Sequence, residues 1–219
     1  MKIKKTKKIM KTISYKLNKI ARKLYKGRDI SHGILHVSRV RNNARMISEK
    51  MQITDINTLI KIEAAALFHD LWDHKYINHE ANEYTNIKKI FNEELKKNYF
   101  SDHDIKEIEI IINNISLSRE INLRKDNKSF NLKHLQLMRD IVSDADKLEM
   151  LGFDGINRII EYQMHKYPYT KSDELKFIVK DVYNNKISRL IDDKYIRTNV
   201  GIELAKPLMQ EMDNYIKLI

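Results

Sequence analysis

A histidine and an aspartate stand together where an apolar run of the sequence ends. Residues 64–68 have the sequence AAALF and are followed directly by His69 and Asp70. A helix of this composition is typically buried, and neither an imidazole nor a carboxylate is stable in apolar surroundings without a partner. A carboxylate at the C-terminal end of a helix also opposes the helix dipole. The pair therefore predicts a cation close to Asp70.

Two other segments carry side chains that could complete a metal site. His36 begins an apolar helical stripe in HVSRV, and Asp144 and Asp146 lie at the end of another in SDADKLEML. Two imidazoles and two carboxylates make a mixed nitrogen and oxygen site, which suits Mn²⁺, Fe²⁺, Co²⁺, Ni²⁺, Mg²⁺ or Zn²⁺. Such a site leaves coordination positions for water and for substrate oxygens.

A second His-Asp pair, His103-Asp104, shows that the dipeptide alone is weak evidence for a metal. It follows Ser101-Asp102 at the expected start of a helix, where acidic side chains complement the helix dipole. We expect a capping role for this copy and no metal. The metal prediction therefore rests on the buried context of His69 and Asp70.

Helical periodicity dominates the sequence and predicts an all-α fold. No segment alternates as a strand would, and five Gly and two Pro are too few for a turn-dense all-β protein. Helix starts are expected at Thr54-Asp55, Ser101-Asp102, Ser172-Asp173 and Thr198, whose side chains favour the N-cap. The polar residues 119–129 are expected to form a mobile loop. We predict a single compact domain.

The positive charge of the protein is concentrated at its N-terminus. The 219 residues carry a formal net charge of +11. Residues 1–28 contain twelve Lys or Arg and no acidic residue, whereas residues 29–219 contain 29 basic and 30 acidic groups. Two interpretations remain open. The segment is a basic helix packed on the domain of residues 29–219, or it is a tether for nucleic acid or another anionic surface.

Several protein classes are excluded by what the sequence lacks. With no Cys, there is no disulfide framework and no thiolate metal site. No run of 18 apolar residues marks a transmembrane helix, and the first thirty residues lack the apolar block of a secretory signal. We therefore expect an intracellular, cytoplasmic protein.

The order His36 … His69-Asp70 … Asp146 resembles the H…HD…D pattern of the HD-domain metal-dependent phosphohydrolases. The likeness continues through SHGILHVSRV, AAALFHDLWDHK, IINNISLS, VSDADKLEMLGFDGINR and YNNKISRLIDDKYIRTNVGIELA, which follow in the order of the segments of small bacterial-type HD hydrolases. It covers about residues 25–210. The resemblance implies an HD-domain helical bundle that acts on nucleotides or related phosphate compounds.

The resemblance also implies a ligand set for one divalent metal ion: His36, His69, Asp70 and Asp146. Asp146 is preferred to Asp144 because the family ligand directly precedes a basic residue, which leaves Asp144 a supporting or capping role. Some HD enzymes bind a second metal through additional histidines, but the corresponding stretch here, NNISLSRE, has none. His79, His103 and His134 lack the spacing.

Further residues near these ligands are expected to act on a phosphate. A bound cation makes water a stronger acid and polarises a phosphoryl oxygen, while cationic side chains balance the charge that develops. The candidates for catalytic roles are Asp73, Lys147 and His32. The candidates for binding the substrate phosphates are Lys75, Arg39 and Arg158. Each has a simpler alternative as a solvated or structural group, and Arg39 in particular could only brace a carboxylate.

The leading hypothesis is a phosphohydrolase that cleaves a phosphomonoester or phosphoanhydride bond of a nucleotide. Removal of pyrophosphate from a nucleoside triphosphate is one reaction that the resemblance allows. Two alternatives remain: a nucleotide phosphodiesterase, and a non-catalytic binding module that keeps the HD scaffold and holds nucleic acid through residues 1–28. Exposed helix faces also allow a homodimer.

Overall fold

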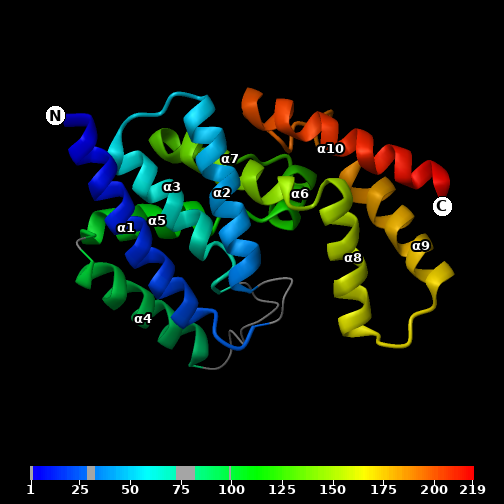
Figure 1. Cartoon of the computed structure of the whole chain (residues 1–219), viewed down its shortest axis with the longest axis horizontal. Coiled ribbons are helices and arrows are strands. Elements are labelled where there is room, and N and C mark those ends of the chain that lie inside the picture. Colours follow the sequence, from blue (N-terminus) through cyan, green and yellow to red (C-terminus); the bar gives the residue numbers. More distant parts are fainter. Residues whose placement is uncertain (1, 29–32, 73–81, 99) are drawn as a thin grey trace.

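A computed structural model describes residues 2–28, 33–72, 82–98 and 100–219, with side chains from residue 10 onward (Figure 1). All regular secondary structure in these ranges is helical, as the sequence predicts. The helices are α1 (Lys2–Leu24), α2 (Ile34–Lys50), α3 (Ile56–Phe68), α4 (Glu83–Lys97), α5 (Asp102–Ile112), α6 (Leu117–Lys125), α7 (Gln136–Leu148), α8 (Gly152–Lys166), α9 (Ser172–Val182) and α10 (Asn199–Leu218). A 3₁₀ turn, η2 (Lys133–Leu135), precedes α7, and a π-helical turn, η3 (Tyr183–Ile187), follows α9.

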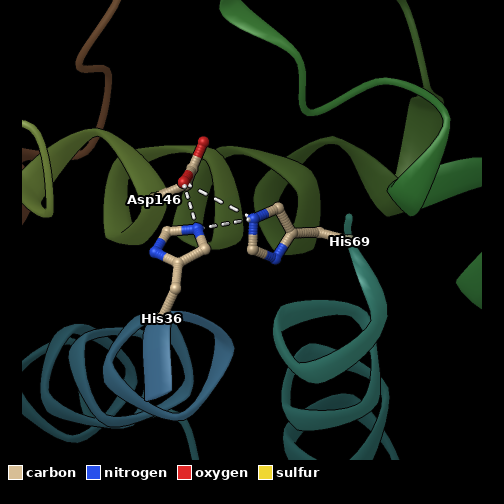
Figure 2. A group of neighbouring side chains, drawn as sticks. All are labelled: His36, His69 and Asp146. Atoms are coloured by element: carbon tan, nitrogen blue, oxygen red, sulfur yellow. Dashed lines mark hydrogen bonds and ion pairs between the residues drawn. The ribbon is translucent and has the colours of Figure 1, made fainter. Parts of the chain in front are cut away.

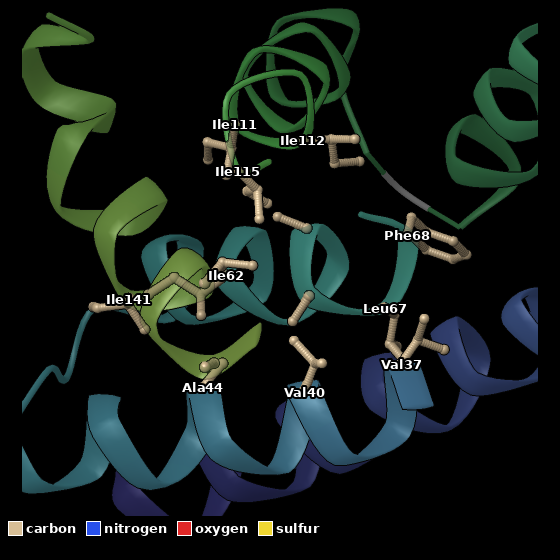
Figure 3. Close-up of a cluster of buried hydrophobic side chains, with 14 of the residues drawn as sticks. Val37, Val40, Ala44, Ile62, Leu67, Phe68, Ile111, Ile112, Ile115 and Ile141 are labelled. Carbon is tan, nitrogen blue, oxygen red and sulfur yellow. The ribbon is translucent and has the colours of Figure 1, made fainter. Parts of the chain in front are cut away.

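The centre of the molecule is α3, which packs against α1, α2, α5 and α7. Its last five residues, Ala64–Phe68, are completely buried, in agreement with the apolar composition of this end of the helix. Figure 3 shows the cluster around it, to which α2 contributes Val37 and Val40, and α5 and α7 contribute Ile111 and Ile141. The C-terminal end of α3 is therefore fixed on several sides.

The predicted helix starts are confirmed, and side-chain caps explain those at Asp55, Ser101 and Thr198. Asp55 accepts a hydrogen bond from the backbone N–H of Thr58 at 2.8 Å, at the start of α3. Ser101 and Asp104 form a reciprocal capping box at the start of α5. Each cap satisfies N–H groups that have no partner within their helix.

The expected loop at residues 119–129 is wrong over most of its length. Residues Leu117–Lys125 form α6, capped by the hydroxyl of Ser116, and Glu120 in its first turn is buried. The polar composition of this stretch reflects ion pairs of Glu120 with Arg139 and Arg197, which lie far away in the sequence. These contacts stabilise a helix that local composition does not favour.

The basic N-terminal segment forms a helix that packs against α3. Leu17, Ile20 and Ala21 on α1, with Tyr25 directly after it, belong to the same hydrophobic core as α3. The helix therefore covers part of the core, while many of its basic side chains face outward. In the described residues no helix is both long and apolar enough to span a membrane.

A second group of helices, α8, α9 and α10, lies on the opposite side of the molecule from α4 (Figure 1). α10 packs against both α7 and α8, and α9 packs against α8. α7 is thus shared between the two groups, because it also contacts α2 and α3. Any side chain on α7 near its C-terminal end lies where these groups meet.

Candidate metal centre

The four predicted ligands come from three neighbouring helices. His36 lies in the first turn of α2, His69 directly follows α3 with Asp70 after it, and Asp146 lies in the last turn of α7. Figure 2 shows the side chains of His36, His69 and Asp146 pointing toward one another. His36 and His69 are buried, with 1% and 8% of their surfaces exposed.

The donor atoms of the four side chains lie close together. Nε2 of His36 lies 3.3 Å from Nε2 of His69, 3.4 Å from Oδ1 of Asp146 and 3.6 Å from Oδ2 of Asp70. Nε2 of His69 lies 3.4 Å from Oδ1 of Asp70 and 3.5 Å from Oδ1 of Asp146. Ligands bound at roughly 2.0–2.2 Å to one cation lie about 3.0–3.5 Å apart. His36, His69 and Asp146 therefore fit a single metal ion, and Asp70 lies beside them with one oxygen near each histidine.

The hydrogen bonding of His69 leaves the correct nitrogen available to a metal. Its Nδ1 lies 2.9 Å from the backbone oxygen of Ala66. A carbonyl oxygen only accepts, so Nδ1 carries the proton, and in the neutral ring Nε2 presents a lone pair to the cluster. Such a bond to the second nitrogen is usual for metal-binding histidines.

The electrostatics of the cluster also call for a cation. Burial lowers the pKa of His36 to about 4, whereas the carboxylates of Asp70 and Asp146 outweigh the effect of burial on His69 and raise its pKa to about 9. Burial raises the pKa of Asp146, but His69 and His36 outweigh this and hold it well below its usual range. A proton on His69 thus balances the carboxylates, and a divalent cation bound there would replace it.

Asp144 is directed away from this cluster and holds the start of α10. It accepts hydrogen bonds from the backbone N–H of Arg197 at 2.9 Å, the backbone N–H of Thr198 at 2.7 Å and the Thr198 hydroxyl at 2.7 Å. Gly201 lies against it so closely that a Cβ atom there would meet Oδ2 of Asp144 at 2.6 Å. The structure places Asp146 with the histidines and gives Asp144 a capping role.

Arg28 supports the His-Asp pair, and the sequence did not single it out. Its guanidinium donates hydrogen bonds to the backbone oxygens of Asp70, at 2.7 Å, and of Leu71. The same guanidinium lies over the ring of Tyr25, 4.8 Å from its centroid. Nothing in its spacing distinguishes Arg28 from the other eleven basic residues of the segment 1–28. Only the fold shows that the end of α1 reaches the end of α3.

Lys147 lies next to Asp146 in the sequence but faces a different set of groups. Its ammonium is buried, donates to the hydroxyl and the backbone oxygen of Ser143, and lies 4.0 Å from Oε2 of Glu120. Burial, and then the charge of Arg139, lower its pKa to about 8. The catalytic role of Lys147 stays a prediction, and these contacts do not favour it.

The two described candidates for phosphate binding differ in their surroundings. Nε of Arg39 lies 3.1 Å from Oε2 of Glu149, which is the bracing contact that the sequence left open. Arg158 is half-buried on α8, and its charge is one of the causes that lower the pKa of His36. The charge of Arg158 therefore acts on the ligand cluster. Three other candidates, His32, Asp73 and Lys75, lie outside the described residues.

A groove of about 520 Å³ lies beyond the Arg39–Glu149 pair, between α2, the α7–α8 connection and α10. None of the described metal ligands lines it. Its polar wall contains Asn43, Glu149, Asp154 and Glu211, and the rest is apolar. Asn43 also donates to Glu149 at 3.0 Å, so this carboxylate is held between two side chains of α2.

The second His-Asp pair shows what the same dipeptide does without a buried helix before it. Asp104 is part of the capping box, and its other oxygen lies 2.9 Å from the ammonium of Lys61, which also pairs with Glu107. Nε2 of His103 lies 3.8 Å from Glu107 on the surface. These carboxylates are already neutralised by a lysine, in agreement with the capping role expected from the sequence.

Comparison with known proteins identifies the fold. No protein-family model and no curated protein sequence matches this chain. Among solved structures, Bacillus subtilis YpgQ in complex with ADP is 23% identical, with a TM-score of 0.67 over 96% of this chain and 94% of YpgQ. A Lactobacillus plantarum protein is 20% identical, with a TM-score of 0.70 over 94% of each chain. An HD-superfamily hydrolase from Bacillus thuringiensis is 21% identical, with a TM-score of 0.58 over 100% of this chain and 96% of that one. The protein therefore has the fold of the HD superfamily.

Proposed function

We propose that the protein is a divalent-metal-dependent phosphohydrolase that acts on a nucleotide. The observation that carries this proposal is the convergence of His36, His69, Asp70 and Asp146, whose donor atoms lie 3.3–3.6 Å apart in the contacts described above. A further support is that YpgQ, with the same fold, holds ADP in its crystal structure.

The residues of the site would divide the work of hydrolysis between them. His36, His69, Asp70 and Asp146 would hold the cation, which polarises a phosphoryl oxygen and makes water a stronger acid. Arg158 would balance charge that develops on the phosphoryl oxygens while water attacks phosphorus and the bond to the leaving oxygen breaks. From the sequence, we assign catalytic roles to Asp73, in proton transfer, and to His32, which would hydrogen-bond a phosphate or orient a ligand, and we assign Lys75 to the substrate phosphates.

The leaving group distinguishes the possible reactions. Release of phosphate from a nucleotide would mark a phosphomonoesterase or a nucleotidase, and release of pyrophosphate from a nucleoside triphosphate would mark a pyrophosphohydrolase. Cleavage of a cyclic or oligomeric nucleotide would mark a phosphodiesterase. We favour the first two, because NNISLSRE supplies no histidine for a second metal.

The experiment compares wild type with His69→Ala and with the matched variant His103→Ala. Both remove a histidine that precedes an aspartate, but only His69 belongs to the buried cluster. A nucleotide panel is assayed with Mn²⁺, Co²⁺, Ni²⁺ and Mg²⁺, with phosphate and pyrophosphate measured separately, and metal binding is followed by calorimetry. We expect His69→Ala to lose metal binding and at least about 100-fold in activity, while His103→Ala keeps both. A folded wild-type protein that binds none of these cations and hydrolyses no nucleotide would overturn the proposal.

A further inference from the structure

α8 has one face toward the protein interior and a different, more exposed face. Ile156 is buried, and the ring of Phe153 meets that of Tyr215 on α10 edge to face, with centroids 6.4 Å apart. A helix turns about 100° per residue, so Arg158, Tyr162 and His165 lie within about 60° of one another, roughly opposite these packed residues. This second face is defined here as the α8 stripe.

The start of α8 is fixed beside the ligand cluster. Only three residues, Glu149–Leu151, separate α7 from α8, and α8 begins at Gly152, where φ is +67°. Glu149 is held by Arg39 and Asn43 of α2, the helix that also carries His36. The charge of Arg158 is one of the causes that lower the pKa of His36, in agreement with this placement.

The C-terminal part of the α8 stripe carries exposed aromatic side chains about one to two helical turns from Arg158. Tyr162 is 42% exposed, and His165 is also exposed. With a rise of about 1.5 Å per residue, Tyr162 lies about 6 Å and His165 about 10 Å along the helix from Arg158. That is the length over which a nucleotide passes from its phosphate to its base. Any of the nucleobases can stack on such an aromatic side chain, because every base has a π-face.

The groove at the other end of α8, at its start, is less suited to bind the substrate. Glu149, whose Oε2 lies 3.1 Å from Nε of Arg39, lines the groove at the start of α8. The groove itself contains the carboxylates of Glu149, Asp154 and Glu211. Like charges repel, so a chain of phosphates is disfavoured there.

From this arrangement we propose that the α8 stripe binds the nucleoside part of the substrate, with Tyr162 as the stacking platform for the base and Arg158 at the phosphates. Tyr162 is then a specificity-determining residue that distinguishes nucleotides from phosphate compounds without a base. This inference rests on the proposed function, since it concerns the substrate of that same site.

The test compares a nucleoside triphosphate with inorganic tripolyphosphate, which has the phosphates but no base. We expect Tyr162→Ala to raise KM for the nucleotide about 5- to 100-fold with little change in kcat, and Tyr162→Phe to restore KM. The loss should be confined to the substrate that carries a base. Calorimetry with a non-hydrolysable nucleoside triphosphate should show the same loss of affinity. Tyr169→Ala is the matched control, because Tyr169 is 96% exposed and lies beyond the end of α8.

The outcomes separate this inference from the proposed function. An active wild type whose nucleotide KM and affinity are unchanged by Tyr162→Ala would overturn the inference alone. So would equal losses with nucleotide and tripolyphosphate. If Met46→Trp, which narrows the groove, raised the nucleotide KM instead, the base would lie in the groove. A wild type that hydrolyses no nucleotide and no tripolyphosphate with any metal would contradict the proposed function itself.

Discussion

Asp146 and Lys147 are neighbours on α7 but face different surroundings, because successive side chains on a helix point about 100° apart. Asp146 points toward His36 and His69, whereas Lys147 points toward Ser143 and Glu120. Their adjacency in the sequence motif is therefore no evidence that the two residues share a functional role. The roles follow from the helix face on which each residue lies.

Replacement of Lys147 by Met tests its predicted catalytic role. Methionine fills the buried space without the charge, and Glu120 keeps Arg139 and Arg197 as partners. We expect kcat to fall by less than about tenfold, whereas loss of a group that stabilises the transition state typically costs about 10²–10³. Steady-state kinetics with a parallel thermal unfolding curve decide the matter. A loss of 100-fold or more in a variant of unchanged stability would show that Lys147 acts on the substrate.

At the residue scale, the sequence predicted what the motif order determines and missed what only tertiary contacts determine. His36, His69, Asp70 and Asp146, which the motif order singles out, lie close together, and their roles as ligands stay a prediction. Arg28 was grouped with the other basic residues. Its acceptor is a backbone oxygen, which every residue type has, so the sequence cannot reveal the hydrogen bond.

Among the elements, α7 is held in place by charges that lie outside the metal cluster. Glu120 on α6 pairs with Arg139 at 2.6 Å and with Arg197 at 2.5 Å, and Arg139 is completely buried. Burial raises the pKa of Glu120, but the two arginines outweigh it and lower the pKa to about 2. This ion-pair network connects α6, α7 and the segment before α10.

Glu120→Gln should destabilise the protein, because it leaves Arg139 buried with less compensation. We expect a loss of about 3 kcal/mol in the free energy of unfolding at pH 7, the lower end for breaking a buried ion pair. The folded pKa is below the unfolded one, so this contribution is present above about pH 4.5 and is lost as the pH falls toward about 2. Urea unfolding at pH 7, 4 and 3 measures it, with exposed Glu203→Gln as the control. A difference that grows on acidification would contradict this account.

At the scale of elements, local signals predicted where helices begin but not which polar stretches are helical. Asp55, Ser101 and Thr198 cap helices through hydrogen bonds to residues three positions later, which a sequence window contains. Residues 117–125 form a helix whose partners are 19 to 77 positions away from Glu120, beyond any such window. That is why this segment was wrongly predicted to be a loop.

For the molecule as a whole, α1 combines a buried face with an excess of positive charge. Leu17 and Tyr25 are buried against the rest of the core, and Arg28 reaches the backbone of Asp70 and Leu71. Deletion of residues 1–28 would thus remove core and site support together. It cannot separate a structural role of the segment from binding of an anionic partner.

Charge removal without deletion makes that separation. Lys2, Lys4, Lys5, Lys7 and Lys8 are replaced by Gln, which lowers the formal net charge of +11 by five. If the segment also holds nucleic acid, retention on a DNA column should weaken and lose part of its salt dependence, because fewer counterions are released. Thermal stability and hydrolysis should stay within error of wild type. Unchanged retention would remove the support for a tether, and an equal reduction in retention from five Lys→Gln changes elsewhere would show a nonspecific charge effect.

The hold of Asp144 on the start of α10 has a consequence for amide proton exchange. The N–H groups of Arg197 and Thr198 precede α10, yet both are bonded to a buried carboxylate on α7. Their exchange with solvent therefore requires α10 to separate from α7, not merely the first turn of a helix to fray. The two amides thus report on an opening between α7 and α10. Their acceptor, Asp144, is only two residues along the chain from Asp146.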